Sequence, residues 1–142
     1  VRADVSNPDD VKALLSQTEE ELGPITDLVN SAALATGIGP IEDLDIEQTR
    51  RMLEINVFGY SFAAIARCGE WQGVAAAKAA DHQSFLGSGK NALVGSFVDY
   101  TVGKAAVDSL TQGLAQEQGP EGISVFGVRP GIINTDMVKE AA

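Results

Sequence analysis

The order of elements in the 142-residue sequence predicts an α/β protein with a parallel sheet in a single domain. Short apolar runs bounded by glycine or proline alternate with longer segments of helical periodicity. The predicted order is strand, helix, strand, helix, helix, strand. Polar or turn-forming residues follow the expected strands at Asp4, Asn30 and Pro130. These positions mark the carboxyl edge of a parallel sheet, where ligands bind.

The first part of the chain is expected to hold a strand, a helix and a second strand. Residues 1–5 have the composition of a strand end, and residues 6–10 combine cap residues, an early proline and two acids. Helical apolar spacing follows until Gly23 and Pro24, which end the helix. Residues 25–29 are expected to form a short strand.

The rest of the chain is expected to hold two longer helices and a strand. Asp45 with Gln48 three residues later resembles a capping box, and it begins a helix expected over 46–68. Apolar periodicity predicts a second helix over 98–118, and residues 123–128 have the character of a buried strand.

Charge and composition exclude several classes of function. The formal net charge of −10 disfavours nucleic acid and anionic membrane as partners. The single cysteine, Cys68, excludes an internal disulfide, and neither it nor the lone His82 has neighbours at metal-ligand spacing, so no metal site is expected. No apolar run is long enough to span a membrane and no signal peptide opens the chain, so a cytoplasmic protein is expected. The missing signal peptide is uninformative if the chain lacks its true N-terminus.

Tyr100 and Lys104 stand four residues apart, which places both side chains on one face of the expected helix. A phenol titrates near pH 10 in water, so it exchanges protons at neutral pH only if its anion is favoured. An ammonium about 4 Å away, at an effective dielectric of about 20, favours that anion by up to roughly 4 kcal/mol, or some three pKa units. The pair therefore predicts a general acid/base. The alternative is a half-buried ring beside a solvated amine.

Five features in sequence order resemble the short-chain dehydrogenase/reductase family, whose members transfer hydride between a nicotinamide cofactor and an alcohol or carbonyl. The resemblance covers most of the chain and implies a partial Rossmann-type, doubly wound parallel sheet. It also implies NAD or NADP as cofactor and a small alcohol or carbonyl as substrate. The residues that carry it are Asp4-Val5, Asn30-Ser31-Ala32-Ala33, Asn56, Tyr100 with Lys104, and the turn 130–135.

The resemblance implies a role for each catalytic residue. Tyr100 is the proton donor or acceptor, while Lys104 lowers its pKa and holds the nicotinamide ribose. Asn56 widens its helix locally and holds a water that links the lysine to solvent; a solvent-facing asparagine is the alternative. Ser88, or Ser84, is the nearest candidate for the serine that polarises the carbonyl.

The resemblance also implies how the cofactor binds. The adenine amino group meets the residues after the first strand, the ribose approaches the segment 30–33, and the carboxamide contacts the turn 130–135. An ordinary turn aspartate is the alternative at position 4. The implied cofactor-binding residues are Asp4, Val5, Asn30, Ala32, Tyr100, Lys104, Pro130, Ile133 and Thr135. The sequence does not choose between NAD and NADP.

Three departures from the family pattern lead to the expectation that this chain is a fragment without activity. No glycine-rich strand-to-helix turn that would hold a pyrophosphate is present, and the C-terminus lacks the end of the fold. Residues 69–95 favour helix where the family has a central strand ending before the serine. A compensated pair of frameshifts is one hypothesis for this stretch, testable in the nucleotide sequence.

A non-catalytic remnant or an association module is therefore the competing prediction. In the family, the helices that correspond to 46–68 and 98–118 pack against partner subunits, so a homo-oligomer through these helices is expected.

Overall fold

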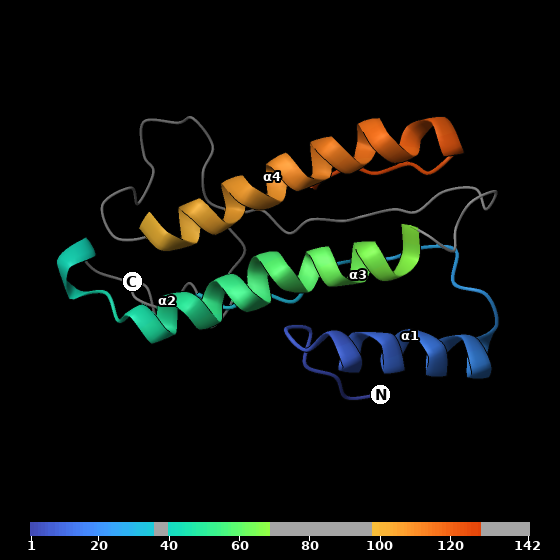
Figure 1. The fold of residues 1–142 in the computed structure, drawn as a ribbon, viewed down its shortest axis with the longest axis horizontal. Coiled ribbons are helices and arrows are strands. Elements are labelled where there is room, and N and C mark those ends of the chain that lie inside the picture. Colours follow the sequence, from blue (N-terminus) through green and yellow to red (C-terminus); the bar gives the residue numbers. More distant parts are fainter. Residues whose placement is uncertain (36–39, 69–97, 129–142) are drawn as a thin grey trace.

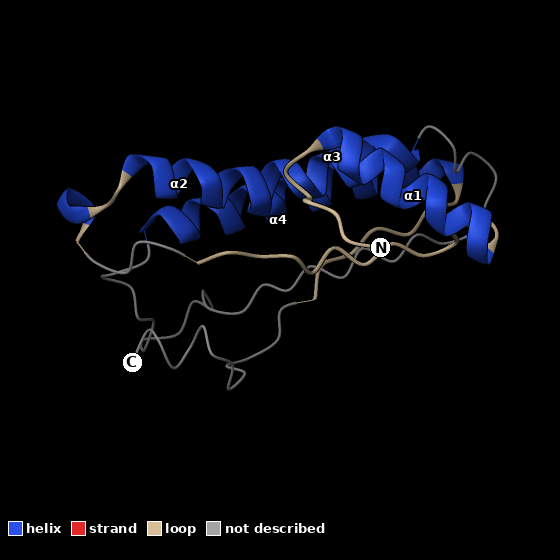
Figure 2. Cartoon of the chain, turned by 90° about the horizontal axis from the view of Figure 1, so that it is seen from below, coloured by secondary structure: helices blue, strands red, loops and turns tan. Residues whose placement is uncertain are grey.

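The computed structural model describes residues 1–35, 40–68 and 98–128. Helices form one layer, and extended segments of the chain run beneath them (Figure 2). Three consecutive helical segments, α2, η2 and α3, follow one another as a continuous rod across the molecule (Figure 1). Helix α4 lies along this rod, and α1 packs against α3. Among the described helices, none is both long enough and apolar enough to cross a membrane.

Helix α1 (Pro8–Leu22) begins and ends where the sequence predicts. The Asn7 side chain accepts a hydrogen bond from the Asp9 backbone N–H at 3.0 Å and so caps the first turn. Gly23 ends the helix in a left-handed conformation (φ 86°), and its N–H bonds to the Glu19 carbonyl. Val11 on the inner face is buried against α3.

The helix expected over 46–68 is present and carries a change of winding in its middle. A short 3-10 turn, η1 (Ile41–Asp43), precedes α2 (Ile46–Leu53), which continues through the π-helix η2 (Glu54–Phe58) into α3 (Gly59–Cys68). Asp45 caps α2 as predicted, because its carboxylate accepts bonds from two backbone N–H groups at 2.9 Å.

Helix α4 (Val98–Gln118) packs closely on the α2–η2 rod and is followed by the 3-10 turn η3 (Gly119–Glu121). A Cβ added at Gly103 would lie 3.5 Å from Met52 Sδ, an ordinary van der Waals contact, so the two helices approach closely there. Met52 and Val107 are almost fully buried at this contact layer, at 0% and 1% exposure. Their burial fixes how α4 lies against the rod.

The strands expected at 1–5, 25–29 and 123–128 are not assigned as strands, and among the described residues only Val128 takes part in a β-bridge. The apolar packing that such strands would provide is present: Ile123 is buried against Ile25 and Leu28, so the two segments lie side by side. A strand also requires a repeated backbone hydrogen-bond ladder to a neighbour, and the described segments do not build one. The parallel sheet stays a prediction.

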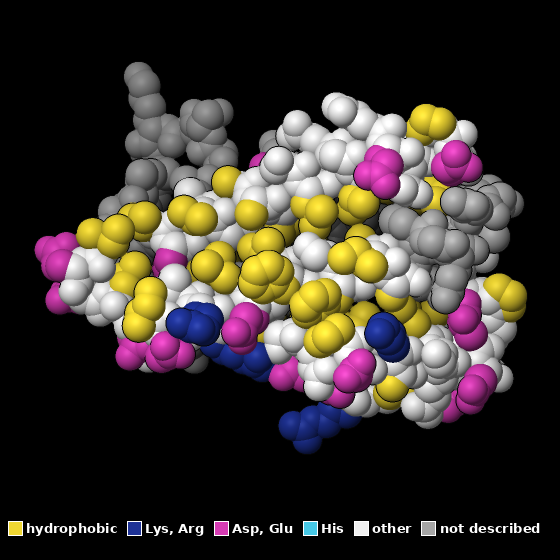
Figure 3. Space-filling model, viewed as in Figure 1, with side chains coloured by type: hydrophobic (Ala, Val, Ile, Leu, Met, Phe, Trp, Pro, Cys, Tyr) yellow, Lys and Arg dark blue, Asp and Glu magenta, His cyan; other side chains and the backbone are white. Residues whose placement is uncertain are grey.

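Several large apolar side chains on the helical layer remain exposed. Figure 3 shows apolar side chains over α2, α3 and α4 on the face turned to the viewer. The most exposed ones on these helices are Ile46 (71%), Ile65 (74%) and Val102 (56%). Phe58 on η2 and Val98 at the start of α4 are exposed as well. We call these five residues the apolar helix face.

Candidate active site

Tyr100 and Lys104 lie on the same face of α4 and are both buried, at 7% and 5% exposure. The Lys104 Nζ atom is 5.5 Å from the centroid of the Tyr100 ring and 6.0 Å from the centroid of the Tyr60 ring on α3. The alternative of a solvated amine is therefore wrong. An ammonium held between two aromatic rings is in a position to interact with their π-faces and to favour negative charge nearby.

The start of α4, next to Tyr100, is tied to α2 through a buried aspartate. Asp99 accepts a hydrogen bond from the Tyr100 backbone N–H at 2.7 Å, and its other carboxylate oxygen accepts one from the Thr49 hydroxyl at 3.2 Å. Sequence reasoning missed this contact. Its only signal was an acid in the first turn of a helix, where the exposed N–H groups favour negative charge.

Asn56 is fully buried (0% exposure) at the centre of the π-helix η2. Its Nδ2 donates to the Leu34 carbonyl at 2.7 Å, and its Oδ1 accepts from the Leu34 N–H at 2.8 Å. The predicted local widening of the helix is confirmed, and the solvent-facing alternative is wrong. The reciprocal bonds hold the segment that contains Asn30 and Ala32 against the rod, a contact that the sequence did not indicate.

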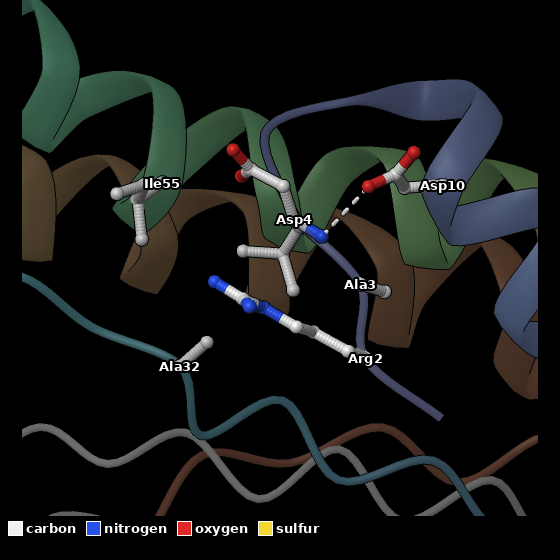
Figure 4. A pocket seen from close by; sticks show the side chains of 7 residues that line it. Arg2, Ala3, Asp4, Asp10, Ala32 and Ile55 are labelled. Atoms are coloured by element: carbon white, nitrogen blue, oxygen red, sulfur yellow. Dashed lines mark hydrogen bonds between the residues drawn. The ribbon is translucent and has the colours of Figure 1, made fainter.

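Three predicted cofactor-binding residues, Asp4, Val5 and Ala32, line one pocket of about 490 Å³. Figure 4 shows that the pocket is bounded by the first residues of the chain, by Ala32 on the segment below them and by Ile55 on η2. Its volume is in the range of small-molecule and cofactor sites. The complete lining is Arg2, Ala3, Asp4, Val5, Asp10, Ala32 and Ile55.

The Asp4 carboxylate is held by three hydrogen bonds. Its Oδ1 accepts from the Ser6 N–H at 3.0 Å and from the Ser6 hydroxyl at 2.7 Å, and its Oδ2 accepts from Arg51 Nη2 at 2.6 Å. The Ser6 hydroxyl and the Arg51 guanidinium, which favour the charged carboxylate, lower the pKa of Asp4 to about 2. Arg51 Nη1 also lies 3.5 Å from Glu54 Oε2, so a residue of the same rod holds the guanidinium as well. No motif or spacing in the sequence indicated that Arg51 belongs to the site.

The remaining predicted site residues, Ser88, Pro130, Ile133 and Thr135, lie outside the described residues. Within the described part of the chain, no cluster of three or more histidine, cysteine or acidic side chains is placed to hold a metal ion.

Comparison with known sequences places these features in a family context. The sequence model of the short chain dehydrogenase family matches residues 1–142. An uncharacterized oxidoreductase of Escherichia coli, YgfF, is 34% identical over 96% of this chain and 56% of its own length. The cis-4-hydroxycyclohexanecarboxylate dehydrogenase of Sinomonas cyclohexanicum is 33% identical over 97% of this chain and 54% of its own length. The chain thus spans about half the length of these relatives.

Solved structures show the same likeness in three dimensions. A short-chain type dehydrogenase/reductase from Mycobacterium marinum superposes with a TM-score of 0.85 at 31% identity. The superposition covers 99% of this chain and 55% of the Mycobacterium chain. A short chain dehydrogenase from Burkholderia cenocepacia, solved in complex with NADP, gives a TM-score of 0.82 at 28% identity, covering 96% of this chain and 54% of its own. These likenesses support the predicted α/β class.

Proposed function

The chain belongs to the short-chain dehydrogenase family, and from this premise we propose that it carries the proton-transfer centre of an NAD(P)-dependent oxidoreductase. The proposed reaction interconverts an alcohol and a carbonyl on a small molecule. The observation that carries the proposal is the buried pair on α4, Tyr100 and Lys104, with Nζ 5.5 Å from the ring centroid. The relatives named as dehydrogenases support the same reaction class.

In this proposal Tyr100 exchanges the proton of the substrate oxygen. In the oxidation direction the phenolate accepts the hydroxyl proton, and in the reduction direction the phenol donates one to the carbonyl oxygen. Lys104 favours the phenolate through its positive charge, because the attraction between the two charges is stronger in a buried site than in water. The nicotinamide cofactor, when bound, supplies the hydride donor or acceptor. Asn56, seated in the wide turn of η2, would belong to the proton path, and Ser88 would polarise the carbonyl.

The described pocket fits the adenine end of such a cofactor. Its aliphatic lining at Val5, Ala32 and Ile55 suits a planar ring, and Asp4 suits an exocyclic amino group. An ionised carboxylate has about four acceptor positions, of which three are used by Ser6 and Arg51, so one remains for such a donor. Asn30 and Ala32 would lie at the ribose, and Pro130, Ile133 and Thr135 at the carboxamide. The Burkholderia relative solved with NADP supports this class of cofactor.

For the fold, we propose that residues 1–142 form one partial NAD(P)-binding domain, with 69–95 departing from the family pattern. The segments 25–29 and 123–128 would be neighbouring strands of a doubly wound parallel sheet, which their shared core at Ile123 supports. A cytoplasmic location stays a prediction from the sequence.

Cofactor titration tests the proposed function on the protein itself. NAD or NADP should raise the thermal midpoint of the 142-residue protein in a saturable way, because a ligand bound only to the folded state stabilises it by mass action. Lys104→Met should reduce that rise in the thermal midpoint. The matched control is Lys12→Met, because Lys12 is an exposed lysine of α1 that makes only a weak ion pair with Asp9. No rise with either cofactor at millimolar concentration would contradict the proposal.

The second candidate is an association module, and the apolar helix face favours it. Ile46, Phe58, Ile65, Val98 and Val102 expose large apolar surface on the rod and α4. Such a surface commonly marks a contact with another protein. We propose a homo-oligomer through helices 46–68 and 98–118, which is compatible with either function.

A further inference from the structure

The adenine-end pocket is built from two separate parts of the chain, and the Arg51 side chain connects them. The first wall is the segment Arg2–Val5, and the facing wall includes Ile55 on η2. Arg51 lies on α2 four residues before Ile55, so the two side chains leave the same side of the rod. From there Arg51 donates to Asp4 at 2.6 Å and to the Ser6 hydroxyl.

The Asp4 carboxylate is oriented by this contact. In Figure 4 it points toward the helices and away from Ala32 and Arg2. The Asp4 backbone N–H is bound by Asp10 at 2.9 Å, which fixes the main chain but leaves the side-chain direction to Ser6 and Arg51. Arg51 is thus the partner on the rod that, together with Ser6, sets where the remaining acceptor position of Asp4 faces.

Resting on the proposed function, we propose that Arg51 is a positioning residue for the adenine end of the cofactor, which it controls by orienting Asp4 and by holding the two walls of the pocket together. Arg51 would set the affinity for an adenine nucleotide without taking part in proton transfer, because its contacts are with Asp4, Ser6 and Glu54. Its planar guanidinium is suited to this task since it contacts Ser6 and Asp4 through two different nitrogens in a fixed fork, whereas a lysine has a single nitrogen at the end of a flexible chain.

Arg50 provides a matched control in the adjacent position. It is an arginine of the same helix, but its side chain is 65% exposed and lies 3.7 Å from Glu47 in a solvent-facing ion pair. Substituting Arg50 removes the same charge and the same helix-forming side chain without touching the pocket lining. Any difference between the two substitutions therefore reports the contacts of Arg51 with Asp4, Ser6 and Glu54.

The experiment is ligand-observed NMR titration of the 142-residue protein and its variants with two probes, adenosine monophosphate and nicotinamide mononucleotide. Arg51→Ala should weaken binding of adenosine monophosphate about tenfold, the lower end of the loss seen when the outer partner of a metal ligand is removed. It should leave binding of nicotinamide mononucleotide unchanged. Arg50→Ala should bind both probes like the parent protein, and Arg51→Lys should recover part of the lost affinity. Thermal midpoints of all variants are measured alongside.

Equal affinity of Arg51→Ala and Arg50→Ala for adenosine monophosphate would overturn the inference while leaving the proposed function intact. An equal loss for both probes would also overturn it, because that result indicates a general disturbance of the protein. If the parent protein shows no binding of adenosine monophosphate, the inference fails together with the proposed adenine site. Should Arg51→Ala fail to fold, Arg51→Lys decides the question, since it keeps the charge and loses only the forked contact.

Discussion

At the scale of single residues, the burial of Lys104 sets it apart from the other lysines and arginines discussed above. A buried ammonium is unfavourable unless its surroundings compensate the lost hydration. Two aromatic rings, at 5.5 and 6.0 Å from Nζ, supply part of that compensation. Lys104 is thereby placed with its Nζ atom beside the Tyr100 ring.

Tyr100→Phe tests the role of the phenol. In a form of the protein that shows turnover, the substitution should reduce kcat by at least about a hundredfold, because a general acid/base is lost. Affinity for NADP should stay within about twofold, since the ring remains in place. Stopped-flow turnover and cofactor titration measure the two quantities. Unaltered kcat would remove Tyr100 from the mechanism.

Asp4 gives the molecule a defined acid sensitivity. Its pKa in the folded protein is about 2, against an ordinary value of 3.8. A carboxylate whose pKa is lowered by folding contributes stability above its unfolded pKa, and that contribution is lost as the pH falls from about 4 to about 2. Carboxyl-carbon NMR should show Asp4 titrating in that lower range, and Arg51→Gln should raise its pKa toward 3.8. An Asp4 midpoint near 3.8 in the parent protein would contradict the bonding described.

At the scale of elements, Gly59 determines how closely α3 approaches the first segment of the chain. A Cβ added there would lie 3.0 Å from Val5 Cγ2 and 3.2 Å from the Val5 carbonyl oxygen, and the latter cannot move as a side chain can. Because Val5 also lines the pocket, Gly59 couples the packing of α3 to the shape of the proposed cofactor site.

Gly59→Ala should therefore destabilise the protein by about 1–3 kcal/mol, the usual range for overpacking. Gly113→Ala on α4 is the matched control, because nothing lies within 4 Å of its added Cβ. It should be neutral or stabilising by up to about 1 kcal/mol, since alanine favours helix over glycine. Urea unfolding followed by circular dichroism gives both values. Equal effects at the two positions would contradict the close approach at Val5.

The elements that the sequence predicted best are those with local signals. Asn7 and Asp45 cap the helices that they were expected to begin, and Gly23 ends α1. Contacts between distant segments were not predictable in the same way, because neither a motif nor a period encodes them: Arg51 with Asp4 and Asn56 with Leu34 are separated by 47 and 22 residues. Strand assignment likewise depends on a neighbouring backbone rather than on the apolar run itself.

At the scale of the whole molecule, the apolar helix face is expected to bury itself against a second copy of the chain. Ile65→Glu and Val102→Glu should lower the fraction of oligomer, because each places a charge on that face. Leu22→Glu is the control, since Leu22 is 82% exposed at the end of α1, away from this face. Sedimentation velocity measures the distribution. A monomeric parent protein would contradict the proposed assembly.

The 142-residue polypeptide on its own should show no dehydrogenase turnover with NAD or NADP and a panel of secondary alcohols. Its sequence holds no glycine-rich strand-to-helix turn to bind a pyrophosphate. Without that anchor the nicotinamide ring is not positioned for hydride transfer, and positioning alone accounts for roughly 7–11 kcal/mol of catalysis in well-oriented reactions. Cofactor absorbance that changes in proportion to protein concentration, and does not change in Tyr100→Phe, would contradict this prediction.

The paired bonds between Asn56 and Leu34 make one side chain behave like a peptide group of a neighbouring strand. The amide of Asn56 presents a donor and an acceptor to the Leu34 backbone at 2.7 and 2.8 Å, as an adjoining main chain would. Aspartate lacks the donor and leucine lacks both groups, so neither can imitate that peptide. Asn56 therefore has a role in assembling the protein that does not depend on catalysis, and this role is the same under both proposed functions.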